Sequence, residues 1–186
     1  MQAVMKAKIE GLYEAFSDIP KPSSIDSCEC CHTVSEKSIL LTTPLRKLTC
    51  EQLWNYTFSV FNTIGDREDF LYFLPRILEL TYTDDQYDVD LGQVGNKIYQ
   101  SRYWECGSAV QSALEASLLT HFKYVTLEDC SEYSEVSDWV CLIGNAVPNV
   151  DPFLELLIAS DTFKVFYDRE HQYAVKGKLG DAFWED

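Results

Sequence analysis

The chain has 186 residues and a formal net charge of −15, with 15 Lys and Arg against 30 Asp and Glu. An acidic excess of this size repels phosphate backbones and anionic lipid heads, and therefore argues against direct binding of nucleic acid or a membrane surface. Hydrophobic residues make up 46% of the chain, and 10 Phe, 11 Tyr and 4 Trp are present. Because this composition can bury a substantial core, we expect a single folded domain over residues 1–186.

A first helix is predicted over residues 1–16. Its apolar residues recur at intervals of three and four and form one stripe: Val4, Met5, Ile9, Leu12, Tyr13 and Phe16. Pro20 and Pro22 then open a polar, Cys-rich loop at about residues 19–38. The N-terminus is amphipathic rather than a basic segment followed by an apolar core, and no apolar run is long enough to span a membrane. We therefore expect a cytoplasmic protein.

A second helix is predicted to begin after the N-cap candidate Thr49, which is followed by Gln52 three positions later. We expect it to extend to Ile64 and to end at Gly65. Asp66 and Asp69 then predict the capped start of a third helix, so that the two form a helical hairpin. The second helix is expected to present one apolar side, made of Leu53, Trp54, Phe58, Phe61 and Ile64.

Pro75 lies inside the third predicted helix, REDFLYFLPRILELTY, where it removes a backbone hydrogen bond at a cost of roughly 3 kcal/mol, so we expect a kink. Further helices are predicted at about 88–104, 106–124 and 150–160. Residues 161–186 fit either two helices or a short hairpin, and we favour helices. The expected fold is an all-α bundle, with solenoid-like stacking of helix pairs as a variant of it.

The segment DSCECCHTVSEKS, residues 26–38, concentrates thiols and an imidazole in five positions. Cys28 and Cys31 have the CxxC spacing with which one tight loop can hold a zinc ion, and Cys30 or His32 could add a ligand. A second CxxC or HxxxH is absent, since the remaining Cys and His residues are scattered: Cys50, Cys106, Cys130, Cys141, His121 and His171.

Three interpretations of the cluster stay open. Free or partly buried thiols in a loop packed on the core are favoured, and a zinc site completed by distant residues is the alternative. A CxxC redox pair is the least favoured interpretation, because such pairs sit at a helix N-terminus after a strand and no strand is predicted here. A disulfide framework does not suit the odd count of seven Cys.

The stretch from Tyr124 to Phe163 contains eight acidic residues and neither Lys nor Arg. A solvated acidic surface is the simplest explanation. The functional alternative is a surface that steers and binds a basic partner, with Tyr133, Trp139 and Phe153 as aromatic anchors. The candidate partner-binding acids are Glu128, Asp129, Glu132, Glu135 and Asp138.

No catalytic residue can be assigned. Nucleotide-binding loops, zinc-protease motifs and nucleophile elbows are absent from the sequence. Thirty acidic residues generate many accidental carboxylate pairs, and none is tied to a His or a nucleophile motif. An enzyme is therefore the less favoured interpretation.

The segment FNTIGDREDFLYFLPRILEL, residues 61–80, resembles a group of uncharacterised bacterial proteins of about this length. The group shares an early CxxC segment, a PLREL-like stretch and a core resembling Thr63 through Leu80. Here the first two correspond to Cys28–Cys31 and to PLRKL at 44–48. The resemblance covers about residues 10–80 and implies a helical fold without an established activity. The extra Cys30 and His32 leave the ligand set of the loop open.

Two hypotheses for the function follow. The leading one is a bacterial interaction protein, most plausibly an immunity or antitoxin-like protein whose acidic surface neutralises a basic toxin domain, with no cofactor. The alternative is a zinc-binding enzyme or regulator that uses the Cys28/Cys31 loop.

Overall fold

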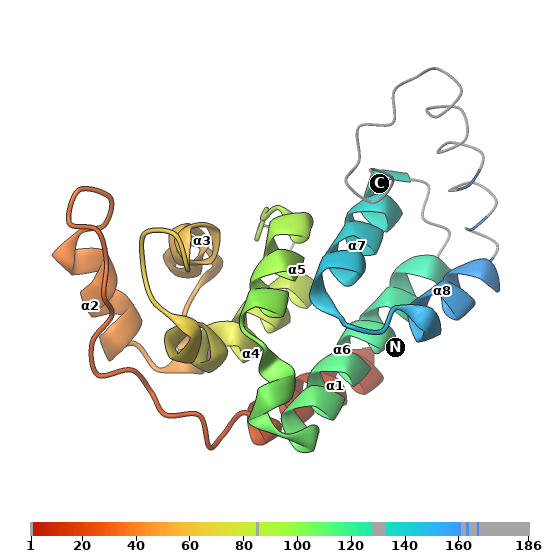
Figure 1. Ribbon diagram of the computed structural model, residues 1–186, viewed down its shortest axis with the longest axis horizontal. Coiled ribbons are helices and arrows are strands. Elements are labelled where there is room, and N and C mark those ends of the chain that lie inside the picture. Colours follow the sequence, from red (N-terminus) through yellow and green to blue (C-terminus); the bar gives the residue numbers. More distant parts are fainter. Residues whose placement is uncertain (1, 85, 128–132, 161–162, 164–166, 168–186) are drawn as a thin grey trace.

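A computed structural model describes residues 2–84, 86–127, 133–160, 163 and 167 of the chain (Figure 1). Within these residues it contains eight α-helices and two short 3-10 helices, with no named strand. The predicted all-α fold is confirmed. The prediction of two helices for the C-terminal segment falls almost wholly outside the described residues.

The first helix, α1 (Gln2–Ala15), matches the prediction. The C-terminal part of its apolar stripe faces inward, with Ile9 and Leu12 buried and Phe16 buried just beyond the helix end, whereas Val4 of the predicted stripe is exposed. It packs against α6 (Ser108–Leu127), far along the chain. The N-terminal segment is therefore part of the core rather than an appendage.

The Cys-rich loop is shorter than expected, because α2 (Val34–Thr42) begins inside the range assigned to it. Thr33 caps this helix: its hydroxyl accepts from the Glu36 backbone N–H, while the Glu36 carboxylate accepts from the Thr33 backbone N–H. This capping box is a recognisable helix start that the prediction missed. The 3-10 helix η1 (Leu45–Lys47) follows.

The helical hairpin is present, with a shorter first arm. α3 (Cys50–Ser59) begins at the predicted capping box of Thr49 and Gln52, but ends before Ile64. The chain then turns through Phe61, at a φ of 67°, and Gly65, at a φ of 65°. Gly65 therefore ends a turn, rather than the helix itself, and its left-handed conformation suits glycine.

The second arm, α4 (Arg67–Thr83), starts at the predicted Asp66–Asp69 capping box and continues through Pro75. The predicted kink stays a prediction. This helix is the centre of the core, and its fully buried side chains are Phe70, Phe73, Leu74, Ile77 and Leu78. A burial of this extent supplies the packing that offsets the hydrogen bond lost at Pro75.

The second half of the chain has one more helix than predicted. α5 (Leu91–Gln100), the 3-10 helix η2 (Tyr103–Cys106), α6 and α8 (Asp151–Ile158) fall in the three predicted ranges. α7 (Tyr133–Ala146) was not predicted, because the acidic residues of this segment were interpreted only as a surface. Its buried residues have helical spacing: Val136, Trp139, Val140 and Ile143.

Among the described helices, the most extensive packing joins α5 to α7, and α1 to α6. A Cβ atom built on Gly95 of α5 would lie 2.4 Å from the Leu142 carbonyl oxygen of α7, so the two backbones touch there. These pairs are distant in sequence, whereas a solenoid stacks consecutive repeats. Figure 1 shows α2 and α3 at one end of an elongated molecule and α7 and α8 at the other.

The helices share one apolar core, which runs from α1 to α8. No helix in the described ranges combines the length and apolar character needed to cross a bilayer.

Candidate functional site

The Cys-rich turn is fixed to the loop that follows α3. The Cys28 backbone N–H donates to the Thr63 carbonyl at 2.8 Å, and the Gly65 N–H donates to the Asp26 carbonyl at 2.7 Å. The backbone N–H groups of Cys31 and His32 both donate to the Cys28 carbonyl, at 3.1 Å each. The backbone from Cys28 to His32 is therefore a closed turn with a defined shape.

His32 anchors the far side of this turn. Its side chain is only 5% exposed, and its Nε2 lies 2.9 Å from the Thr63 hydroxyl oxygen. The imidazole is engaged with the loop after α3, and it does not join the thiols. His32 was predicted as a candidate ligand in addition to Cys28 and Cys31, but its ring nitrogen is instead engaged with Thr63.

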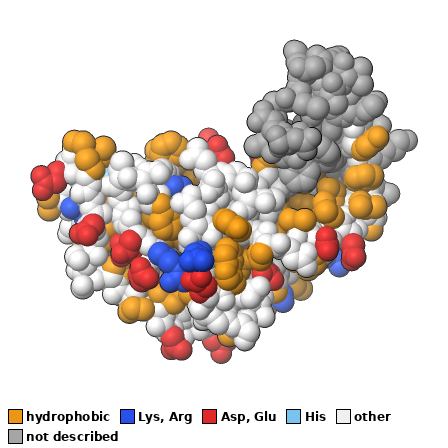
Figure 2. Space-filling model, in the orientation of Figure 1, with side chains coloured by type: hydrophobic (Ala, Val, Ile, Leu, Met, Phe, Trp, Pro, Cys, Tyr) orange, Lys and Arg blue, Asp and Glu red, His pale blue; other side chains and the backbone are white. Residues whose placement is uncertain are grey.

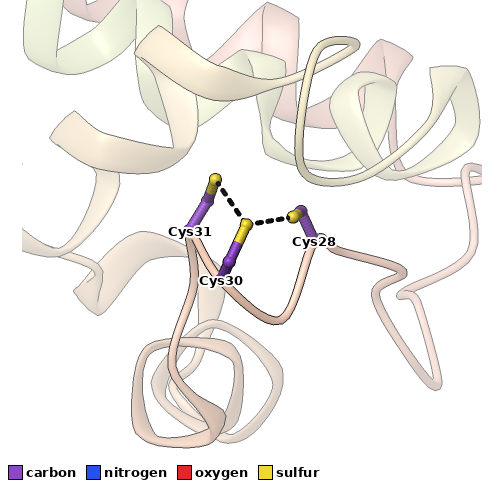
Figure 3. Close-up of side chains that lie close together, drawn as sticks. All are labelled: Cys28, Cys30 and Cys31. Atoms are coloured by element: carbon purple, nitrogen blue, oxygen red, sulfur yellow. Dashed lines mark hydrogen bonds between the residues drawn. The ribbon is translucent and has the colours of Figure 1, made fainter.

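The turn brings three sulfur atoms together (Figure 3). Cys30 lies in the middle, with its Sγ 2.7 Å from that of Cys28 and 3.5 Å from that of Cys31. All three sulfur atoms lie within 4.8 Å of one another, and all three residues are exposed. The predicted pair, Cys28 and Cys31, is thus completed by Cys30, and the thiols are open to solvent rather than packed on the core.

The neighbouring thiols change each other's acidity. Hydrogen bonds from the Cys30 thiol and, to a lesser extent, from Cys31 lower the pKa of Cys28, because they stabilise its thiolate. The same contacts raise the pKa of Cys30 to about 11. Cys28 is therefore the first of these two to become a thiolate, the form that binds metals and attacks electrophiles.

The other cysteines do not extend this group. Cys50, Cys106 and Cys141 are partly buried and lie outside the turn, and Cys130 lies outside the described residues. Among the residues that the structure describes, the group of potential metal ligands consists of Cys28, Cys30 and Cys31. A completed four-ligand site built from remote residues is therefore not formed in this part of the chain.

His121 is a core residue. It is buried between Trp139, at 4.3 Å between ring centroids, and Tyr82, at 4.7 Å. Burial lowers its pKa to about 4, so the ring is neutral near pH 7. It is not placed to serve the thiol group. His171 lies outside the described residues.

The predicted partner-binding acids are described only in part. Glu128, Asp129 and Glu132 lie outside the described residues, as does the side chain of Glu135, and Asp138 is exposed on α7. Figure 2 shows acidic side chains dispersed over the visible face, with a compact Lys and Arg group near its centre. The described part of this face therefore shows no single acidic field.

Two of the proposed aromatic anchors were wrong. Trp139 is buried against Tyr82 and His121, and Phe153 is buried against Phe122 at 5.9 Å between ring centroids. Both residues have helical spacing to other buried positions, so their aromatic character reflects the core. The third candidate, Tyr133, has a side chain outside the described part of the chain.

An exposed aromatic pair on α3 was not predicted as a surface. Trp54 and Phe58 were assigned to the core-facing side, yet they are 47% and 51% exposed. The side of α3 that faces the core contains Leu53, Tyr56 and Thr57. The four-residue interval between Trp54 and Phe58 could have identified a second stripe, set apart from the core positions.

No protein-family model, curated protein or solved structure matches the chain. The resemblance of residues 10–80 to a bacterial group therefore stays a prediction.

Proposed function

We propose that this protein binds one thiophilic metal ion, with Zn²⁺ as the preferred candidate, through Cys28, Cys30 and Cys31, and that it acts as a metal-dependent regulator. The observation that carries the proposal is the convergence of three exposed sulfur atoms within 4.8 Å on one turn. Thiolates select zinc and other soft ions over calcium and magnesium.

The sulfur spacing supports this proposal. Zinc binds thiolates at about 2.3 Å in a tetrahedron, which places neighbouring sulfur atoms about 3.8 Å apart. Cys30 and Cys31 are already 3.5 Å apart, whereas Cys28 and Cys30, at 2.7 Å, would have to separate by about 1 Å. Because the side chains are exposed, rotation about χ1 can supply that movement without disturbing the core.

The donor set leaves one position of a tetrahedron for a ligand from outside the group. His32 is committed to Thr63, so water or a partner molecule would complete the coordination. Metal binding would also release protons, since a thiol such as that of Cys30, with its pKa raised to about 11, must become a thiolate. The affinity of the protein for the metal ion should therefore increase with pH.

The position of the turn suggests what the metal would control. One end of the turn is bonded to Thr63 after α3, and the other leads directly into the capping box of α2. α2 also contacts α3 through the Asn55 side-chain N–H, which donates to Glu36 at 3.0 Å. An ion bound by the three thiolates would further stabilise the turn, and with it the orientation of α2, which begins directly after the turn.

Metal analysis of the reduced protein tests the proposal. After reconstitution with Zn²⁺ and removal of excess ion, we expect one zinc per chain, and a loss of most of it in Cys28→Ser, Cys30→Ser and Cys31→Ser. Cys50→Ser is the matched control, because Cys50 is a partly buried thiol that does not belong to the group of three sulfur atoms. The proposal fails if the reconstituted protein retains no zinc, or if the three variants retain as much as the control.

A second candidate is the bacterial immunity or antitoxin-like role, with a basic toxin domain as the partner. It is supported by the net charge of −15 and by the exposed acids Asp138 on α7 and Asp151 and Glu155 on α8. The excess negative charge of the chain would accelerate association with a basic partner. The test is binding to the product of the adjacent gene: micromolar or tighter binding to a basic toxic domain supports it, and no binding at that concentration removes it.

A further inference from the structure

A small pocket lies beside the exposed aromatic pair, between α3 and the start of α5. Its volume is about 200 Å³, and its lining combines aromatic, apolar and acidic residues: Trp54, Thr57, Phe58, Asp88, Val89, Asp90, Gln93 and Val94. We call it the Trp54 pocket. Sites for drug-sized molecules and cofactors usually exceed about 300 Å³, so this pocket suits a single side chain.

The aromatic wall of the Trp54 pocket is held in place. The rings of Trp54 and Phe58 are nearly parallel, with an interplanar angle of 3° and 5.9 Å between centroids. The Trp54 indole N–H donates to the Asp88 carbonyl at 2.8 Å, which fixes the ring against the segment before α5. With both residues about half exposed, ring surface stays accessible to a ligand.

The charge of the lining is negative. Asp88 and Asp90 are both exposed, and none of the eight lining residues is Lys or Arg. Asp90 is also ordered, because its carboxylate caps α5 by accepting from the Gln93 backbone N–H at 2.9 Å. The pocket thus combines the ordered carboxylate of Asp90 with the exposed ring of Trp54, and a carboxylate and an aromatic ring both attract a cation.

We propose that the Trp54 pocket binds an arginine side chain presented by a basic segment of a partner protein. A guanidinium group is planar, so it can stack on an aromatic face while its N–H groups donate to a carboxylate. The proposal deepens the second candidate function, since it gives a basic partner a specific contact. It does not depend on metal binding.

The test measures peptide binding at the Trp54 indole in the full-length protein. The probe is a blocked Gly-Arg-Gly peptide, and the matched control peptide has citrulline, the uncharged analogue of arginine, at the same position. The Trp54 indole N–H resonance is followed by NMR at constant ionic strength, and it is assigned by its absence from Trp54→Phe. We expect a saturable shift with the arginine peptide and little shift with the citrulline peptide.

Charge variants separate the pocket from general acidic attraction. Asp88→Asn/Asp90→Asn should weaken arginine-peptide binding roughly tenfold, and Asn is an equally good N-cap, so α5 is retained. The control Glu14→Gln/Asp18→Asn removes the same charge from two exposed sites outside the pocket lining and should keep the affinity for the arginine peptide within about twofold, because the effect of exposed charges away from the binding site is screened by salt.

Three results would overturn the proposal: no saturable shift at tens of millimolar arginine peptide, equal shifts with citrulline, or equal weakening in both double variants. If the adjacent-gene product binds in spite of such a result, the partner uses another surface. Binding of a basic partner would then remain supported, whereas arginine binding in the Trp54 pocket would be excluded.

Discussion

Replacement of Gly95 by alanine probes the close approach of α5 to α7. The added Cβ would lie 2.4 Å from the Leu142 carbonyl oxygen and 3.0 Å from the carbonyl carbon and Cα of the same residue. Carbon atoms in ordinary contact are about 3.5–4.0 Å apart, so α5 and α7 would have to separate by about 1 Å. Overpacking of this kind costs about 1–3 kcal/mol, and a clash between two backbones belongs at the upper end.

Gly11 supplies the matched control, because it also lies within a helix but a Cβ there would meet nothing within 4 Å. Gly11→Ala should raise the free energy of unfolding by about 0.5–1 kcal/mol through helix propensity alone. Gly95→Ala gains the same propensity term, so the difference between the two variants isolates the packing cost.

Urea denaturation followed by far-UV circular dichroism measures this difference. We expect Gly95→Ala to be less stable than Gly11→Ala by about 2–3 kcal/mol, with similar slopes. Equal stabilisation by both substitutions would refute the close packing of α5 on α7, and with it the arrangement of the second half of the fold.

Three further substitutions test buried polar groups by the same denaturation assay. Burial raises the pKa of Asp69 to about 6, above its ordinary value of 3.8. The folded chain thus binds this proton more tightly than the unfolded chain, and the free energy of unfolding should fall as pH rises from about 4 to about 6. Asp69→Asn should remove that fall. The Tyr56 hydroxyl is buried without a hydrogen-bond partner among the described residues, so Tyr56→Phe should leave stability unchanged or raise it by up to about 1 kcal/mol, and a loss of stability would reveal a partner. Lys97 is buried and donates to the Val60 carbonyl at 2.7 Å, so Lys97→Met should cost about 1–3 kcal/mol, whereas no loss would contradict that contact.

The helix starts that were predicted correctly depend on local chemistry. Thr49 and Asp66 each cap the helix that follows, because a capping box needs only residues three positions apart in sequence. The Thr33–Glu36 box is equally local, and it was missed because the surrounding cysteines were assigned to a loop. α7 was missed for a similar reason. Its acidic residues were interpreted as a surface, and the helical spacing of Val136, Val140 and Ile143 was not recognised.

Other features depend on contacts between distant segments. The end of α3 at Ser59 depends on the turn at Phe61 and on the pairing of Thr63 with Cys28, which local patterns do not reveal. The CxxC spacing correctly indicated the thiol turn. The sequence could not show that Cys30 joins the sulfur group or that His32 contacts Thr63 instead of the thiols. Both features depend on how the turn packs against Thr63, which only the structure reveals.

The role of Cys30 is the central claim about the site, because CxxC spacing alone would assign the ion to Cys28 and Cys31. Titration of the reduced protein with Co²⁺, a spectroscopic substitute for zinc, tests it through the thiolate-to-cobalt charge-transfer absorbance. We expect saturation at one ion per chain, with an absorbance that falls by about a third or more in Cys30→Ser as one of three thiolates is lost, and stays unchanged in Cys50→Ser. An undiminished absorbance and stoichiometry in Cys30→Ser would contradict the three-thiolate site.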